Sequence, residues 1–289
     1  MRPIQFLRQN TQQHWVGNGF PVRALFSHMD GSLPTDPFLM LDYAAPYEFS
    51  AGSRIPRGVG QHPHKGFETV TLAFQGEVAH RDSGGGGGVI RAGDVQWMTA
   101  GSGIIHDEFH SPEFLQQGGT LEMVQLWVNL PARNKSAPPR YQHLAKDTIP
   151  VVELANGAGS LRVVAGQHQD VRGAADTFTE LNVWDIRLNA GKQVALEVPS
   201  THSLMTVVLH GKVLLNNGEY AEDGTVVGYG DGSRITLAAE GRDAHILLLS
   251  GVPIGEPIAA YGPFVMNTEA EIHQAFSDFQ AGRFGEIAA

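Results

Sequence analysis

The sequence predicts an all-β protein, and three observations support this fold class. Glycine accounts for 35 of the 289 residues and proline for 16, so turns and strand ends are frequent. Charged residues make up 17% of the chain, against about 25% in average globular proteins, which argues against a charged helical bundle or coiled coil. Short apolar runs bounded by Gly, Asp and Asn recur at 70–74, 121–130, 207–215 and 244–251, which is typical of strands.

Two strand-rich regions flank a proline-rich segment, so we expect two domains. Residues 131–150 contain Pro131, Pro138 and Pro139 together with many polar side chains, which predicts a linker. The expected domains are therefore 1–130 and 151–289. The two parts of the chain also differ in charge: residues 1–140 carry 11 basic and 12 acidic side chains, net −1, and residues 141–289 carry 9 and 18, net −9.

A weak internal repeat also favours two domains. A shift of 135 residues aligns 68–78 with 203–213, with identities at Thr71/Thr206, Gly76/Gly211 and Val78/Val213. Two unrelated strands that each end in a turn glycine would give the same pattern. The NNG triplet at 216–218 predicts a hairpin turn, and the run Gly84–Gly88 predicts a flexible loop tip.

One helix is predicted near the C-terminus. Thr268 and Glu271 form a capping box, and Gly282 stands where a helix end is expected. His273 lies off the apolar face and should be exposed. The apolar face should pack on a β domain, and it consists of Ile272, Ala275, Phe276 and Phe279.

Composition excludes several function classes. The chain has no cysteine, which rules out disulfides, thiolate zinc sites, iron–sulfur clusters and a cysteine nucleophile, so any transition metal must be held by His, Asp or Glu. The net charge of 20 − 30 = −10 argues against direct nucleic-acid binding. No apolar run approaches the ~18 residues of a membrane span, and the N-terminus does not resemble a signal peptide. A cytoplasmic protein without membrane contact is therefore expected.

Two short motifs indicate a metal site. His62 and His64 lie in GVGQHPHKGFETV (58–70), and His106 and Glu108 lie in GDVQWMTAGSGIIHDE (93–108). In a strand, residues i and i+2 project from the same face, so two such pairs on neighbouring strands would place three imidazoles and one carboxylate around a divalent metal. Glu68 has the same parity as the first pair and could join it.

These histidines also fit roles that involve no metal. An HxH pattern can be accidental in a chain with 13 histidines, and a histidine on an apolar strand can simply be a hydrogen-bonded core residue. His80 and His110 could lie behind the metal ligands, but we expect both at the surface.

The two motifs resemble the pirin family of the cupin superfamily. The C-terminal segment YGPFVMNTEAEIHQAFSDFQAGRFG (261–285) is similar to the closing segment of bacterial pirins, so the resemblance spans nearly the whole chain. It implies a bicupin: two antiparallel, jelly-roll-like β-barrels with a short C-terminal helix, of which the first holds one metal ion. The implied ligands are His62, His64, His106 and Glu108.

Two departures from the general cupin pattern matter. Cupins commonly use a glutamate of the first motif as a ligand, here Glu68, whereas the pirin pattern uses Glu108 and leaves Glu68 outside the first shell of ligands. The 135-residue shift places Glu197 and Pro199 opposite His62 and His64, so the second domain should not hold a metal.

The resemblance also implies a reaction. Bacterial pirins resemble quercetin 2,3-dioxygenases, which open the central ring of a flavonol with O2 and release CO. The donor set leaves Fe, Mn, Ni, Cu, Co and Zn open, and the resemblance favours iron. Glu108 would act as the general base that takes the proton of the flavonol 3-hydroxyl. Phe67, Trp97 and Met98 either line an apolar substrate pocket or fill the core.

A second hypothesis belongs to another class of function. Eukaryotic pirins are viewed as iron-containing, redox-responsive nuclear cofactors that bind transcription factors, which would make the metal a switch and the function a contact with a protein partner. The absence of a basic run typical of nuclear localisation favours the enzyme. A third possibility is a metal-bound domain without flavonol activity.

Overall fold

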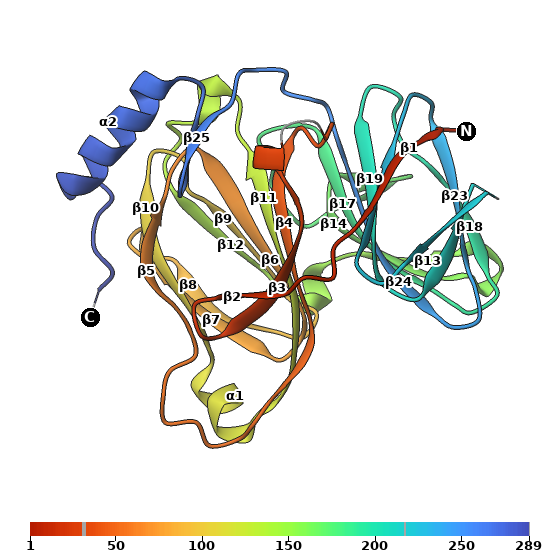
Figure 1. Cartoon of the computed structure of the whole chain (residues 1–289), viewed down its shortest axis with the longest axis horizontal. Helices are drawn as coiled ribbons and strands as arrows, with labels where there is room; N and C mark the ends of the chain where they lie inside the picture. Colours follow the sequence, from red (N-terminus) through yellow and green to blue (C-terminus); the bar gives the residue numbers. More distant parts are fainter. Residues whose placement is uncertain (31–32, 217, 289) are drawn as a thin grey trace. The chain divides into compact units, whose positions relative to one another are not determined.

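The computed structural model describes residues 1–30, 33–216 and 218–288, and it consists mostly of antiparallel strands (Figure 1). The chain divides into two compact units. The first unit contains Gln13–Arg23, Phe38–Lys146 and Ile254–Ala289. The second unit contains Met1–Gln12, Ala24–Pro37 and Asp147–Pro253.

The first unit contains a seven-stranded and a four-stranded antiparallel sheet. The larger sheet has the order β12 (Arg140–Leu144), β9 (Val95–Thr99), β6 (Phe67–Gln75), β11 (Gly119–Asn129), β4 (Phe38–Phe49), β3 (Phe20–Ser27) and β2 (His14–Val16). The boundary between the units falls within β3, after Arg23. The smaller sheet has the order β5 (Gly58–His64), β10 (Ile104–His110), β7 (Glu77–Asp82) and β8 (Gly87–Arg91). Apolar side chains of both sheets share one core, which includes Ala73 and Met123 from the larger sheet and Val78 and Ile90 from the smaller.

The second unit repeats this arrangement. Its larger sheet has the order β1 (Ile4–Gln9), β22 (Thr225–Tyr229), β19 (Ser203–His210), β24 (Ala244–Gly251), β17 (Leu181–Leu188), β14 (Gly159–Ala165) and β13 (Val151–Leu154). Its smaller sheet has the order β18 (Gln193–Glu197), β23 (Arg234–Ala239), β20 (Lys212–Leu215) and β21 (Glu219–Glu222). A further pair joins β15 (Gln167–His168) to β16 (Val171–Arg172).

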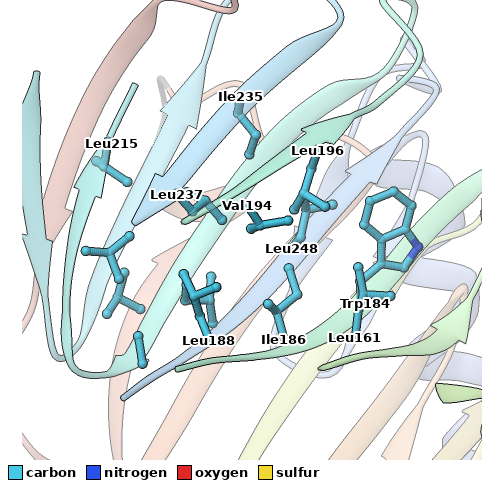
Figure 2. Close-up of a cluster of buried hydrophobic side chains, with 14 of the residues drawn as sticks. Leu161, Trp184, Ile186, Leu188, Val194, Leu196, Leu215, Ile235, Leu237 and Leu248 are labelled. Atoms are coloured by element: carbon cyan, nitrogen blue, oxygen red, sulfur yellow. The ribbon is translucent and has the colours of Figure 1, made fainter. Parts of the chain in front are cut away.

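Alternation along the strands explains the core of the second unit. On β18, Val194 and Leu196 are buried while their neighbours are exposed, as expected for a strand with one face on the core. These side chains meet Ile186 and Leu248 of the larger sheet, so the two sheets pack face to face (Figure 2).

The predicted all-β fold with two domains is confirmed, but closed barrels are not formed by strand pairing. Each larger sheet runs between two edge strands that do not pair with one another, β12 and β2 in the first unit and β1 and β13 in the second. Among the described residues, each unit is therefore a sandwich of two open sheets. The predicted hairpin at 216–218 joins β20 to β21, which pair antiparallel, although Asn217 lies outside the described residues.

The two units do not follow the expected boundaries at 130 and 151. Residues 131–146 belong to the first unit, because β12 pairs with β9 along the edge of the larger sheet. Residues 254–289 also belong to the first unit, and residues 1–12 belong to the second, because β1 pairs with β22. Long-range strand pairing, which the proline content of the segment does not reveal, decides these assignments.

The internal repeat corresponds to equivalent strands. In the first unit β6 lies between β9 and β11, and in the second unit β19 lies between β22 and β24. His62 pairs with His106 across β5 and β10, and at the equivalent place of the second unit Glu197 pairs with Arg234 across β18 and β23. The second unit therefore has a glutamate opposite an arginine where the first unit has two histidines opposite each other.

The predicted C-terminal helix is α2 (Glu269–Gln280), and its capping box is present. The Thr268 hydroxyl accepts from the Glu271 amide, and the Glu271 carboxylate accepts from the Thr268 amide. The helix packs on the hairpin of β25 (Ala259–Tyr261) and β26 (Phe264–Met266) (Figure 1). His273 is exposed, as expected. Gly282, just beyond the helix, has a φ of 72°, which favours glycine.

A second helix, α1 (Pro112–Gln117), was not predicted. It begins at Ser111, whose hydroxyl accepts from the Phe114 amide, and Pro112 occupies the first helical position. The remaining helical segments are single 3-10 turns at His28–Asp30, Ala132–Asn134, Lys146–Thr148 and Ala155–Gly157. Within the described part of the chain, none of the helices is both long enough and apolar enough to cross a membrane.

Candidate metal centre

The two predicted histidine motifs lie on neighbouring strands. His62 and His64 are on β5 and His106 is on β10, and the strand register pairs His106 with His62 and Ile104 with His64. The ring centroids of His62 and His106 are 4.2 Å apart, those of His64 and His106 4.8 Å, and those of His62 and His64 4.9 Å. One ring nitrogen from each lies within 4.8 Å of the others, which is a geometry that can hold a metal ion.

A glycine allows β5 to approach β10 at this point. Gly58 has a φ of 159°, and a Cβ placed there would lie 2.1 Å from the Glu108 carbonyl oxygen. Since no side chain fits into that space, only glycine permits the close pairing of the two strands.

Burial keeps two of the three imidazoles neutral. His64 is 4% exposed and His106 is fully buried. Burial, and next to it the neighbouring imidazoles, lowers the pKa of His64 to about 3 and that of His106 well below its ordinary value. Neutral imidazoles have a free lone pair, which is the form that binds metals.

Two unpartnered nitrogens fit a metal ion. Nδ1 of His64 and Nε2 of His106 are buried and have no hydrogen-bond partner among the described residues. Such orphaned polar atoms are costly unless a ligand satisfies them. The exposed edge of the cluster is His62, whose Nδ1 hydrogen-bonds the Gly60 carbonyl at 2.8 Å. These donors suit a borderline divalent ion.

Glu108 lies beside His106 but belongs to a second group. Its carboxylate, with nitrogens of His80 and His106, forms a set of ligand atoms within 4.8 Å of one another, so His106 is common to both groups. The carboxylate accepts from Gln96 Nε2 at 3.1 Å and from Gln125 Nε2 at 3.3 Å. The two amides therefore orient the carboxylate.

His80 is buried, and the expectation of a surface position was wrong. It is 1% exposed, and its Nε2 hydrogen-bonds Asp82 at 3.1 Å. Its Nδ1 lies 3.3 Å from Nδ1 of His106 and 3.2 Å from Nε2 of Gln96. Since Nε2 of His80 donates to the carboxylate, Nδ1 of His80 is an acceptor that faces both the Gln96 amide and Nδ1 of His106. A proton on Nδ1 of His106 leaves Nε2 of His106 with a free lone pair.

The glycine-rich loop supports this network. Oδ1 of Asp82 accepts from the amides of Gly84 and Gly86 at 2.8 and 2.9 Å, so the start of the predicted loop tip wraps around a buried carboxylate. Burial alone would raise the pKa of Asp82, but the hydrogen bonds from His80, Gly86 and Gly84 hold it below its ordinary value. His80 and Asp82 are an i, i+2 pair like His62 and His64, so the same parity could have identified them.

His110 is also buried, contrary to the expectation. It is 2% exposed, its Nε2 donates to the Gly19 carbonyl at 2.9 Å, and its ring lies 4.5 Å from that of Phe49. The hydrogen bond and the aromatic neighbour, both distant in sequence, account for its burial.

All three apolar side chains that the sequence singled out for a pocket or the core are fully buried: Phe67, Trp97 and Met98. Phe67 lies against the histidines, with its ring 5.2 Å from that of His64, whereas Met98 packs with Ala100 and Ile104. Trp127, which the sequence did not single out, has its ring 5.3 Å from that of His64.

Glu68 lies outside both groups of candidate ligands. It is 1% exposed on β6 and accepts a hydrogen bond of 2.7 Å from the Thr99 hydroxyl. Burial raises its pKa from 4.5 to about 7.

This shift predicts a pH-dependent stability. Between pH 4.5 and pH 7 the unfolded chain ionises at Glu68 while the folded chain retains the proton, so the free energy of unfolding falls as the pH rises, by up to about 3 kcal/mol. In Glu68→Gln this component is absent. Urea unfolding of both proteins across this range should therefore show wild type losing stability relative to the variant as pH rises, and parallel pH profiles would contradict the assignment.

The paired sheets and the buried histidine cluster define a two-domain protein of the cupin class, and the comparisons with known proteins agree. The family model described as Pirin matches residues 19–128, and the Pirin C-terminal cupin domain matches residues 183–285. The chain belongs to the pirin family.

Relatives and solved structures match most or all of the chain. A Pseudomonas aeruginosa protein named "putative quercetin 2,3-dioxygenase" is 51% identical over 98% of this chain and 99% of its own length. A crystal structure of quercetin 2,3-dioxygenase from Acinetobacter baumannii has a TM-score of 0.96 and 52% identity, with all of both chains covered. A bacterial pirin from Escherichia coli, solved in complex with nickel(II), shares the fold at 23% identity, with a TM-score of 0.65 over 86% of this chain and 99% of its own.

Proposed function

We propose that this protein is a metal-dependent dioxygenase that opens the central ring of a flavonol such as quercetin with O2 and releases CO. The observation that carries the proposal is the cluster of His62, His64 and His106, in which His64 and His106 each keep an unpartnered buried nitrogen, together with the Glu108 carboxylate in a second group that shares His106. Support for the substrate comes from relatives at 51% and 52% identity that carry quercetin 2,3-dioxygenase names.

The three histidines and Glu108 are the proposed ligands. His106 is shared by both candidate groups and therefore anchors the site, and His80 orients it through the contact between their Nδ1 atoms. When bound, a divalent ion supplies positive charge that favours deprotonation of a nearby hydroxyl, and a redox-active metal such as iron supports reaction with O2. We propose iron as the native metal, with Mn, Ni, Cu, Co and Zn as alternatives of the same ligand chemistry.

Glu108 is the proposed general base. The amides of Gln96 and Gln125 hold its carboxylate in place, and the carboxylate retains lone pairs to accept the proton of the flavonol 3-hydroxyl. Since the group is 5% exposed, little water competes for it.

A cavity of about 370 Å³ lies close to this network and offers room for part of a flat substrate. It is lined by Asp82, residues 84–87, Ile104 and Pro139–Tyr141. The Tyr141 ring stacks on His80 with centroids 5.0 Å apart, so one wall of the cavity touches the side chain that orients His106. The volume falls within the range of small-molecule sites, about 300–1,000 Å³.

Metal analysis followed by a quercetin assay tests the proposal. Purified protein should contain one equivalent of a transition metal, and protein loaded with the active metal should consume one O2 and release one CO for each quercetin. Free metal without protein is the control for non-enzymatic oxidation. No CO above this control with any of the six metals would refute the dioxygenase, and protein that still binds its metal would then fit the hypothesis of a redox-responsive regulator.

A further inference from the structure

The C-terminal segment of the first unit lies against the turn that carries His64. The turn between β5 and β6 forms a bridge with β26, in which Lys65 is the partner of Phe264. The Lys65 amide donates to the Pro263 carbonyl at 3.3 Å, and the Val265 amide donates to the Lys65 carbonyl at 3.1 Å. Residues nearly 200 positions apart in the sequence are thus joined by backbone hydrogen bonds.

The same segment contacts the imidazole of His64. The Pro263 carbonyl accepts a hydrogen bond from this ring. Because Nδ1 of His64 has no partner among the described residues, Nε2 is the donor and Nδ1 keeps the lone pair. A carbonyl in this position fixes both the tautomer and the orientation of a metal-binding histidine.

Lys135 ties the segment to the turn. Its side chain is 2% exposed, and Nζ donates to the Gly66 carbonyl at 2.8 Å, to the Val265 carbonyl at 2.9 Å and to Oδ1 of Asn129 at 2.8 Å. These three bonds use all three donors of an ammonium group. A Cβ on Gly66 would lie 2.0 Å from the Val265 carbonyl, so glycine is needed for the two chains to approach.

Burying the ammonium group of a lysine at this place costs free energy. Burial lowers the pKa of Lys135 to about 8, which records the cost of keeping the charge away from water, although the group is still protonated at pH 7. An apolar side chain would avoid this cost but could not join three carbonyl oxygens from separate segments.

An ion pair also joins the turn between β5 and β6 to the C-terminal helix. Nζ of Lys65 lies 2.8 Å from Oδ2 of Asp278 on α2, and both side chains are largely buried. The helix also packs on β26 through Ile272 and Ala275. The turn that carries His64 is therefore held by both the hairpin and the helix.

We propose that Lys135, together with the segment Pro263–Val265, is a positioning element for the metal ligand His64. Lys135 touches no candidate ligand. It binds the turn on one side and the segment on the other, so that the Pro263 carbonyl stays on the His64 ring. The proposal rests on the metal site proposed above.

Titration with Co(II) tests the proposal, because cobalt reports affinity and ligand geometry through its visible absorption. Lys135→Met should bind Co(II) about 10- to 100-fold more weakly than wild type and should shift the absorption bands. Lys135→Gln retains two donors and should fall between the two proteins. Lys192→Met, the same change at an exposed lysine of the second unit, should match wild type in both measurements.

The outcomes separate the two proposals. If wild type binds no cobalt, the metal site itself is wrong. If wild type binds and folded Lys135→Met or Lys135→Gln has the same affinity and spectrum, only the positioning role is overturned. Asp278→Asn covers the case in which neither Lys135 variant folds: it loosens the segment at the helix, so it should weaken cobalt binding severalfold, and unchanged binding would overturn the proposal.

Discussion

Replacing His106 by alanine should abolish stoichiometric metal binding. His106 is the one residue common to both groups of candidate ligands, it is fully buried, and its Nε2 has no partner among the described residues. Loss of outer residues that orient a ligand costs about 10- to 100-fold in metal affinity, so loss of the ligand itself should cost at least about 100-fold. Elemental analysis of the purified variant should fall from one equivalent to a small fraction.

A matched control separates loss of the ligand from general damage. His273→Ala removes an exposed imidazole on α2, outside both groups, and should retain the full equivalent. Circular dichroism should show that both variants keep the strand content of wild type. A folded His106→Ala protein that retains one equivalent of metal would show that the ligand assignment is wrong.

Replacing Glu108 by glutamine should remove most of the dioxygenase activity. The amide has nearly the same shape and can still approach the metal, but it cannot accept a proton. General-base catalysis typically contributes about 10²- to 10⁴-fold, so CO release at saturating metal and quercetin should fall by a factor in this range. The rate should be measured on samples whose metal content has been determined, since Glu108 is also a proposed ligand.

Glu113→Gln is the matched control for this change. Glu113 lies in the first turn of α1, and its side chain is 57% exposed, so neutralising it should leave CO release unchanged. If Glu108→Gln kept its metal and turned quercetin over at the wild-type rate, Glu108 would not be the base.

Strand parity predicted the core of the candidate site. His62 and His64 project from one face of β5, and the register with β10 places His106 opposite His62. The 135-residue repeat also corresponds to real equivalence, because Glu197 pairs with Arg234 where His62 pairs with His106. The shared face of the two histidines follows from the two-residue period of a strand, and the equivalence of the two units follows from matched residues in the two halves of the chain.

The i, i+2 parity of His80 and Asp82 could have pointed to this pair, but the burial of His80 could not be predicted, because it depends on contacts between distant segments. His80 is buried by Tyr141, which stacks on it, and by Asp82 and Gln96, which hydrogen-bond it. Its own sequence neighbours, Ala79 and Arg81, gave no sign of this. Burial of a polar side chain is set by its cross-strand partners, and these become known only with the register.

The bounds of the two units also depend on contacts between segments that are distant in the sequence. Residues 131–150 are rich in proline, yet β12 within them pairs with β9. Lysine is a residue type expected at the surface, but Lys135 is buried and donates to three oxygens, of Gly66, Asn129 and Val265.

An anomalous-diffraction map of metal-loaded crystals tests the central claim most directly. A single peak is predicted within about 2.0–2.2 Å of a nitrogen of His62, of His64 and of His106, with the Glu108 carboxylate as the fourth ligand. A peak held by His80, His106 and Glu108, with His62 and His64 uncoordinated, would contradict the account, as would the absence of any peak near His106.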